Sequence, residues 1–221
     1  AIGGGALSAE TVGDRATAVG YQSLYLQVSD SDNEQSRNTG VGMYASHYNV
    51  TGQNNTSLGY QAGMGVSSKS HSGCTFLGAY AGATSYTGAN NIAIGNYAMD
   101  DTDADPTVGA STENIFIGNS AGGGTWETAA SNYNVAIGNN SMDAAMNGAL
   151  NNTSVGNASL GALTTGDSNV AIGSGAGALL TVGYNNIIIG VSAGDAILDS
   201  NNHVIIGVGA GGNQDIANDG A

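Results

Sequence analysis

The chain has 221 residues, a formal net charge of −14 and a glycine-rich composition, with 37 Gly and only 9% charged side chains. Three Lys and Arg residues cannot neutralise a nucleic-acid backbone or an anionic membrane surface, so neither is expected as a partner. An apolar fraction of 41% distinguishes the chain from a disordered polar sequence. Its single cysteine, Cys74, excludes an internal disulfide.

A repeat with a minimum length of 17 residues runs through the sequence. It is marked by twelve glycines that each follow an aliphatic residue: Gly3, Gly20, Gly42, Gly59, Gly78, Gly95, Gly118, Gly138, Gly156, Gly173, Gly190 and Gly207. Such self-similarity is typical of a solenoid, in which a single coil cannot bury its own faces and stacking stabilises the array. The sequence therefore predicts an all-β parallel solenoid of about twelve coils.

In chain order, the coils differ in length. Half a coil comes first, at residues 1–3, and insertions follow at 21–37, 60–73, 96–113, 119–133 and 139–151. The insertions carry much of the charge and are expected to project into solvent. The pattern predicts one domain over 1–221, with looped coils over 1–151, uninterrupted coils over 152–211 and a short tail over 212–221.

Two apolar columns precede the glycines. The third residue before the glycine is β-branched in eleven coils, and the residue directly before it is Ile, Val or Leu in all twelve. Because residues two apart in a strand point to one face, both columns are expected to form the core. This predicted core includes Ile94, Ile117, Ile137, Val155, Ile172, Ile189 and Ile206. The residues between the columns would then point outwards, and the candidate subunit interface among them is Phe76, Phe116, Ile188 and Ile205.

Asparagine recurs four residues before the glycine in eight coils. The column contains Asn38, Asn55, Asn91, Asn114, Asn134, Asn152, Asn169 and Asn186. Stacked amides can hydrogen-bond along such a column and cap the strand starts, so we expect an asparagine ladder. His203 occupies the same column and is interpreted as a substitute for asparagine.

The two ends of the chain are in phase with the repeat. A step from Gly207 past residue 221 to Gly3 of another copy covers 14 + 3 = 17 residues, which is the minimal coil. Asn218 and Asp219 would then take the places that Asn201 and Asn202 hold relative to Gly207. This phasing suggests head-to-tail stacking, in which the tail of one copy completes the coil begun by Ala1 and Ile2 of the next.

Several segments resemble repeats of known fibre proteins. "NNIAIGNYAM", "YNVAIGNNSM" and "SNVAIGSGAG" resemble the repeats in head domains of trimeric autotransporter adhesins. "AVGYQSLY" and "SLGYQAG" are similar to repeats in phage tail fibres and surface proteins that end in an endosialidase-type chaperone. Over residues 1–211, the resemblance implies a left-handed parallel β-roll, a homotrimer, and a place outside the cell, on its surface or in a virion tail fibre. The unit here is longer than in the adhesins and carries insertions.

Motifs of enzymes and metal sites are explained by the repeat or by composition. G-x-S-x-G occurs around Ser120 and Ser192, but it starts at the repeat glycine and lacks a helix and a histidine–acid pair. We therefore expect no enzyme and no cofactor. Asp101, Asp103 and Asp105 resemble the start of a calcium loop, although Pro106 breaks the pattern and a solvated acidic loop is the favoured interpretation.

The expected function is that of a rigid structural or adhesive fibre protein that assembles with copies of itself. Tyrosines outside the core columns would pack against a neighbouring chain or contact a cell-surface receptor or glycan. One alternative is a receptor-binding segment of a phage tail fibre. Another is an ice-binding solenoid, which needs a flat outward array of Thr, whereas here the Thr column lies on the expected core face.

Overall fold

The computed structural model describes residues 1–10, 15–28, 35–67, 69–84, 88–100, 110–126 and 129–212. Within these residues the chain is an all-β parallel solenoid with about 18 residues per turn and no helix, as the repeat predicts. Its eleven strands are β1 (Thr17–Val19), β2 (Thr39–Val41), β3 (Thr56–Leu58), β4 (Thr75–Leu77), β5 (Ile92–Ile94), β6 (Ile115–Ile117), β7 (Val135–Ile137), β8 (Thr153–Val155), β9 (Val170–Ile172), β10 (Ile187–Ile189) and β11 (Val204–Ile206). The left-handed winding of the β-roll and the count of twelve coils stay predictions.

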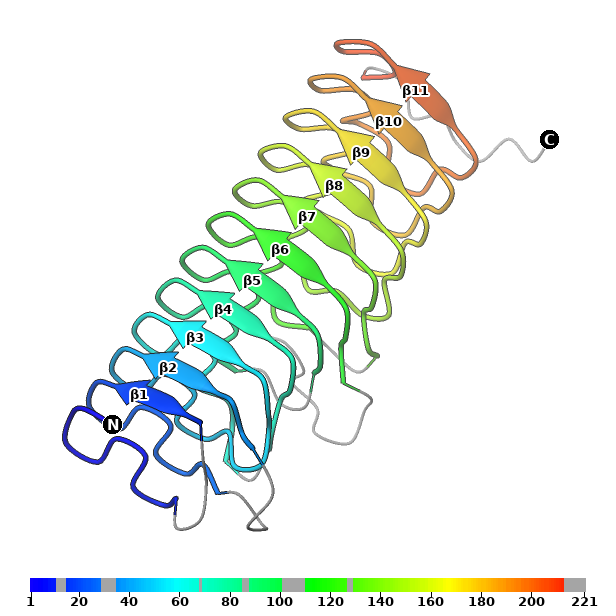
Figure 1. Ribbon diagram of the computed structural model, residues 1–221. Coiled ribbons are helices and arrows are strands. Elements are labelled where there is room, and N and C mark those ends of the chain that lie inside the picture. The colour runs from blue at the N-terminus through cyan, green and yellow to red at the C-terminus, as the bar shows by residue number, and fades with distance from the viewer. Residues whose placement is uncertain are drawn as a thin grey trace.

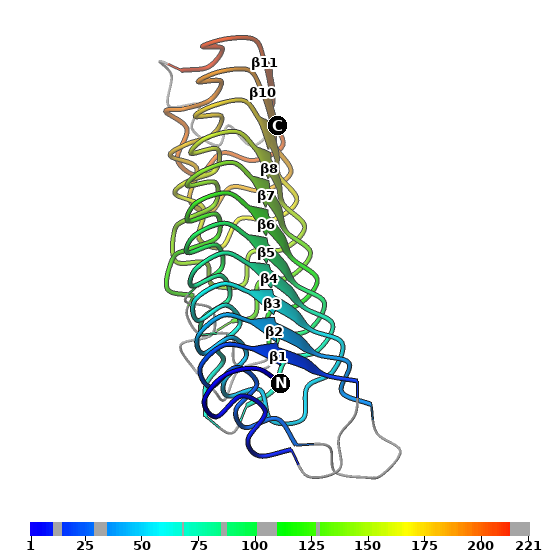
Figure 2. The same cartoon turned by 60° about the vertical axis from the view of Figure 1, so that its left-hand side comes forward.

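The strands form one parallel sheet in chain order, with each strand stacked on the next (Figure 1). The register is constant: the first residue of each strand pairs with the first residue of its neighbour, as Thr17 does with Thr39 and Ile187 with Val204. The sheet forms one side of an elongated rod, and the loops that close each turn lie behind it (Figure 2). The N-terminal residues join the stack through a bridge between Ile2 and Val19, and backbone hydrogen bonds such as Leu7 N–H to the carbonyl of Ser23 extend the contact.

Glycine follows every strand, and after β1–β10 nothing larger fits there. Gly95 has a φ of +137°, a conformation that residues with a side chain rarely adopt. A Cβ atom on Gly95 would also lie 2.2 Å from the carbonyl oxygen of Gly118 in the next turn. Each repeat glycine thus turns the chain and allows the backbones of successive turns to approach closely.

The prediction of which strand face is buried was wrong. The middle residue of each strand points inwards: Phe76, Phe116 and Ile188 are 0% exposed and Ile205 is 7% exposed, so none of them is an outward interface residue. The predicted core residues lie on the open face instead. Ile137, Ile172 and Ile206 are 39%, 40% and 64% exposed, and Ile94, Ile117, Val155 and Ile189 are partly exposed.

The narrow interior of the rod explains this reversal. In most turns the inward strand position holds a small residue, such as Ala93, Ala136 or Ser154. Where this position holds a large residue, the facing turn has a glycine. A Cβ atom on Gly82, for example, would lie 2.2 Å from the ring of Phe76. Protein interiors pack at a nearly constant density. A large residue at the inward strand position is therefore matched by a small residue in the turn that faces it. The bulkier columns have no room inside and lie on the surface.

The asparagine ladder is present. Asn169 donates from its backbone N–H and from Nδ2 to Oδ1 of Asn152, at 2.9 and 3.0 Å, and Asn186 bonds to Asn169 in the same way. Each amide also crosses its own turn, as Asn152 does by donating to the carbonyl of Gly166 at 2.8 Å. These bonds satisfy polar groups that burial would otherwise leave without partners. The backbone N–H of His203 donates to Oδ1 of Asn186, which agrees with its interpretation as a ladder residue.

Candidate functional site

The first candidate site is the open side of the sheet, formed by the first and third residues of strands β1–β11. We call it the outer sheet face. Every one of its residues is Thr, Val, Leu or Ile, and none is charged. Thr occupies the first column in β1–β4 and β8, while Ile or Val occupies it in the other strands. Among its Val, Leu and Ile residues, exposure is greatest at Val204 and Ile206 of β11, at 68% and 64%.

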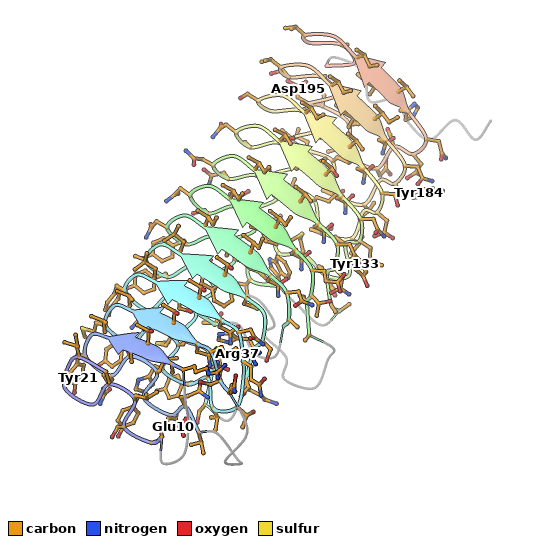
Figure 3. All side chains as sticks on the ribbon, viewed as in Figure 1. Glu10, Tyr21, Arg37, Tyr133, Tyr184 and Asp195 are labelled. Atoms are coloured by element: carbon orange, nitrogen blue, oxygen red, sulfur yellow. The ribbon has the colours of Figure 1, made fainter. Side chains whose placement is uncertain are left out.

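Charged and aromatic side chains lie along the edges of the outer sheet face. Arg37, Tyr133 and Tyr184 lie on the edge where the strands begin, and Tyr21 lies on the opposite edge, beside the turn that follows β1 (Figure 3). With about 4.8 Å between strands and about 3.3 Å per residue, the face measures roughly 50 by 10 Å. Parallel sheets are normally covered on both sides. Here one side of the sheet packs on the interior, and the other side, the outer sheet face, has no covering layer in the described residues.

The second candidate site is a groove on the turns that follow β1, β2 and β3. It has a volume of about 430 Å³ and is lined by Gln22, Tyr44, His47, Tyr48, Gln61 and Met64. We call it the aromatic groove. None of these lining residues, all from the described part of the chain, is charged. Its residues come from three successive turns, and constant register brings them side by side although they are separated in sequence.

Rings inside and beside the groove hold His47 in place. Tyr25 stacks on the imidazole at 5.0 Å between centroids with planes 7° apart, while Tyr44 and Tyr48 meet it nearly at right angles, at 80° and 83°. Nδ1 lies 3.2 Å from the carbonyl of Gln22, and because a carbonyl can only accept, Nδ1 carries the proton. Burial lowers the pKa of His47, partly offset by that hydrogen bond, so the ring is neutral near pH 7.

The sequence motifs of other chemistries do not assemble into sites. Ser120 bonds to Oδ1 of Asn119, and Ser192 lies in the turn after Gly190, where its N–H donates to the carbonyl of Ser174. No group of three or more possible metal ligands occurs within the described ranges. Cys74 is buried, and burial raises the pKa of its thiol to about 11.

Two sets of predicted residues lie outside the described part of the chain. These are the calcium candidates Asp101, Asp103 and Asp105, and the tail residues Asn218 and Asp219. Of the residues predicted to join the tail, Ala1 is exposed and Ile2 is 69% exposed. Head-to-tail stacking therefore stays a prediction.

Sequence reasoning placed the tyrosines outside the core but did not find the groove. Its signal is a column rather than a motif: Gln22, Tyr44 and Gln61 each stand two residues after a repeat glycine. Trp126 belongs to the insertion at 119–133, which was expected to project into solvent, but its side chain is fully buried. It packs against Phe116 at 5.5 Å between ring centroids and donates from Nε1 to the carbonyl of Gly122.

Comparisons with known proteins do not assign the chain to a family. No family model, curated protein or solved structure matches it. In the described residues no helix is long and apolar enough to cross a membrane. Function is therefore inferred from the solenoid, the outer sheet face and the aromatic groove.

Proposed function

We propose that this protein is a structural fibre protein whose outer sheet face packs against further copies of the same chain. The observation that carries the proposal is an uncharged face of Thr, Val, Leu and Ile along all eleven strands. A continuous uncharged surface of several hundred Å² is as large as the largest apolar patch of a typical monomer, and such patches often mark interaction sites. A rigid rod that associates along its length is what a surface adhesin and a phage tail fibre both require.

Charge and area favour a second copy as the occupant. Copies that each carry −14 repel one another, and they approach with least repulsion through a face that has no charged residue. The plane of the face covers roughly 500 Å² before side-chain relief is counted, which approaches the ~800 Å² per partner of a stable interface. Three copies about one axis, outside the cell or on a virion, are the arrangement that the resemblance to adhesin heads and tail fibres implies.

The test is the molar mass in solution, measured by sedimentation velocity and by light scattering after gel filtration. We expect an oligomer for the wild type and a monomer for the double variant Ile137→Glu, Ile172→Glu, because each pair of opposed faces would bury uncompensated carboxylates. Leu198→Glu is the matched control, since Leu198 is 46% exposed but lies outside the outer sheet face. A wild type that stays monomeric at every concentration refutes the proposal.

An ice-binding surface is the second candidate, and the corrected strand orientation favours it. The Thr column of β1–β4 lies on the open face, not in the core, and repeats at the regular spacing of the strands. Against it, the same column holds Ile or Val in six of the eleven strands. The test is thermal hysteresis of the purified protein. If the protein shows it and the substitutions Thr39→Lys and Thr56→Lys abolish it, the function of this face is ice binding and not self-association.

A further inference from the structure

The turn after each strand imposes an unusual backbone on the second residue after the repeat glycine. That residue has a positive φ throughout: 61° at Tyr44, 61° at Tyr80 and 55° at Tyr97. Later turns place Gly175 and Gly209 in the same column, at 67° and 64°. Bulky side chains are rare at positive φ, where the backbone costs roughly 1–2 kcal/mol. The fold alone therefore favours glycine here.

Large side chains occupy this column in one part of the rod only. Gln22, Tyr44, Gln61, Tyr80 and Tyr97 follow β1–β5, and the turns after β6–β11 have only Ser, Asn, Ala or Gly at this position. Since small residues support the same turn, the large ones are not needed for folding. Backbone strain that persists without a structural need points to function.

The side chains that line the groove offer two kinds of contact. Tyr44 and Tyr48 present aromatic surface, and their rings stand nearly perpendicular to His47. The side-chain amide of Gln22 has no hydrogen-bond partner within the described ranges, so it can both donate and accept. Nε2 of neutral His47 has no partner there either and is an acceptor.

The lack of charge among the described lining residues narrows the ligand class. An anionic ligand would find no counter-charge on these residues and would approach a chain of net charge −14. A purely apolar ligand would cover the amide of Gln22 and leave it without a partner, which costs free energy. Nε2 of Gln61 already donates to the hydroxyl of Tyr60 at 3.1 Å, but its carbonyl oxygen would likewise be covered. A neutral molecule with many hydroxyls and apolar C–H faces satisfies both kinds of contact. The volume of about 430 Å³ lies within the usual size of small-ligand sites.

We propose that the aromatic groove binds a neutral saccharide. Tyr44 and Tyr48 pack against the C–H face of a sugar ring. Gln22, Gln61 and His47 exchange hydrogen bonds with its hydroxyls. The inference does not rest on the proposed self-association, because the groove lies on the turns and not on the outer sheet face.

The test is an array of neutral oligosaccharides (glucans, chitin fragments, mannans and galactans), followed by calorimetric titration of the best binder. We expect Tyr44→Gly to weaken binding about tenfold or more, as truncation of an anchoring aromatic residue commonly does. This variant should fold, because glycine already occupies the same column at Gly175 and Gly209. Tyr97→Gly is the matched control, since it makes the same exchange in the same column outside the groove and should bind as the wild type does.

Three results would overturn the proposal. They are no binding of any neutral oligosaccharide, equal weakening by Tyr44→Gly and Tyr97→Gly, or binding of tetramethylammonium in place of every saccharide, which would make the groove a cation site. The double variant Ile137→Glu, Ile172→Glu should still bind sugar. Failure of self-association and failure of saccharide binding are thereby separated.

Discussion

His71 should make the fold sensitive to acid. Its ring is fully buried, packs edge-on against Phe76 at 5.1 Å, and has no hydrogen-bond partner for either nitrogen in the described residues. Its backbone is fixed on both sides, because the N–H donates to Asn49 and the carbonyl accepts from Asn55. Burial without a compensating partner disfavours the charged imidazolium and lowers the pKa of His71 to about 4, from 6.5.

The sign and size of the effect follow from proton linkage. Below pH 6.5 the unfolded chain takes up a proton at this ring and the folded chain does not, so the free energy of unfolding falls as the pH falls. The loss continues until the pH passes about 4, where the folded state is protonated too. At ~1.4 kcal/mol per unit, the difference between 6.5 and about 4 amounts to roughly 3 kcal/mol.

Urea unfolding followed by circular dichroism, at neutral pH and at about pH 4, measures this loss. His71→Leu has no titrating group at this position. Its free energy of unfolding should therefore fall by roughly 3 kcal/mol less than that of the wild type between neutral pH and about pH 4. Carboxylates titrate in both proteins and cancel in the comparison. Parallel curves for His71→Leu and the wild type would refute the reasoning.

Two further predictions concern the interior and the turns. Gly118→Ala should cost several kcal/mol, because its Cβ atom would lie 2.4 Å from the carbonyl oxygen of Gly138. Gly209→Ala, with nothing within 4 Å, should cost only the roughly 1–2 kcal/mol of its positive φ. Thermal melting compares the two, and equal losses would contradict the close approach. Asn152→Ala removes buried hydrogen bonds in both directions along the ladder and should cost about 2–4 kcal/mol, while Asn157→Ala on the surface should change stability by less than ~0.5 kcal/mol in urea titrations.

The repeat made the fold predictable. Each strand ends directly before a repeat glycine, and the asparagines four residues before it stack as the column predicts. Both results depend on spacing alone. Constant spacing in a solenoid fixes which residues lie above one another, without any knowledge of which way they point.

The direction of the side chains could not be read from the same pattern. An alternation with period two identifies two faces and does not say which is inside. The more apolar face was taken as the core, but the rod is too narrow for two columns of Ile and Val. A size signal was available: large Phe76 is matched by Gly63 and Gly82, whose Cβ atoms would lie 2.5 and 2.2 Å from its ring. Such compensation occurs only between residues that share an interior.

The groove was beyond sequence reasoning for a different reason. Tyr44 and His47 belong to one turn, but Gln22 and Gln61 come from the turns on either side. Their convergence requires the backbone of the turns, with its alternating positive φ values, and not only the spacing of the glycines. Binding residues commonly lie on loops whose positions a rigid scaffold fixes, and here the stacked turns are that scaffold.

The asparagine ladder also gives the rod a direction. Every bond between ladder side chains runs the same way, as from Asn114 to Asn91 and from Asn186 to Asn169, so the amide dipoles add along the axis. Backbone dipoles in a sheet largely cancel and contribute little to such a sum. Parallel dipoles that lie side by side repel. Neighbouring rods that point the same way must therefore owe that orientation to contacts between their side chains, whereas the ladder by itself favours neighbours of opposite direction.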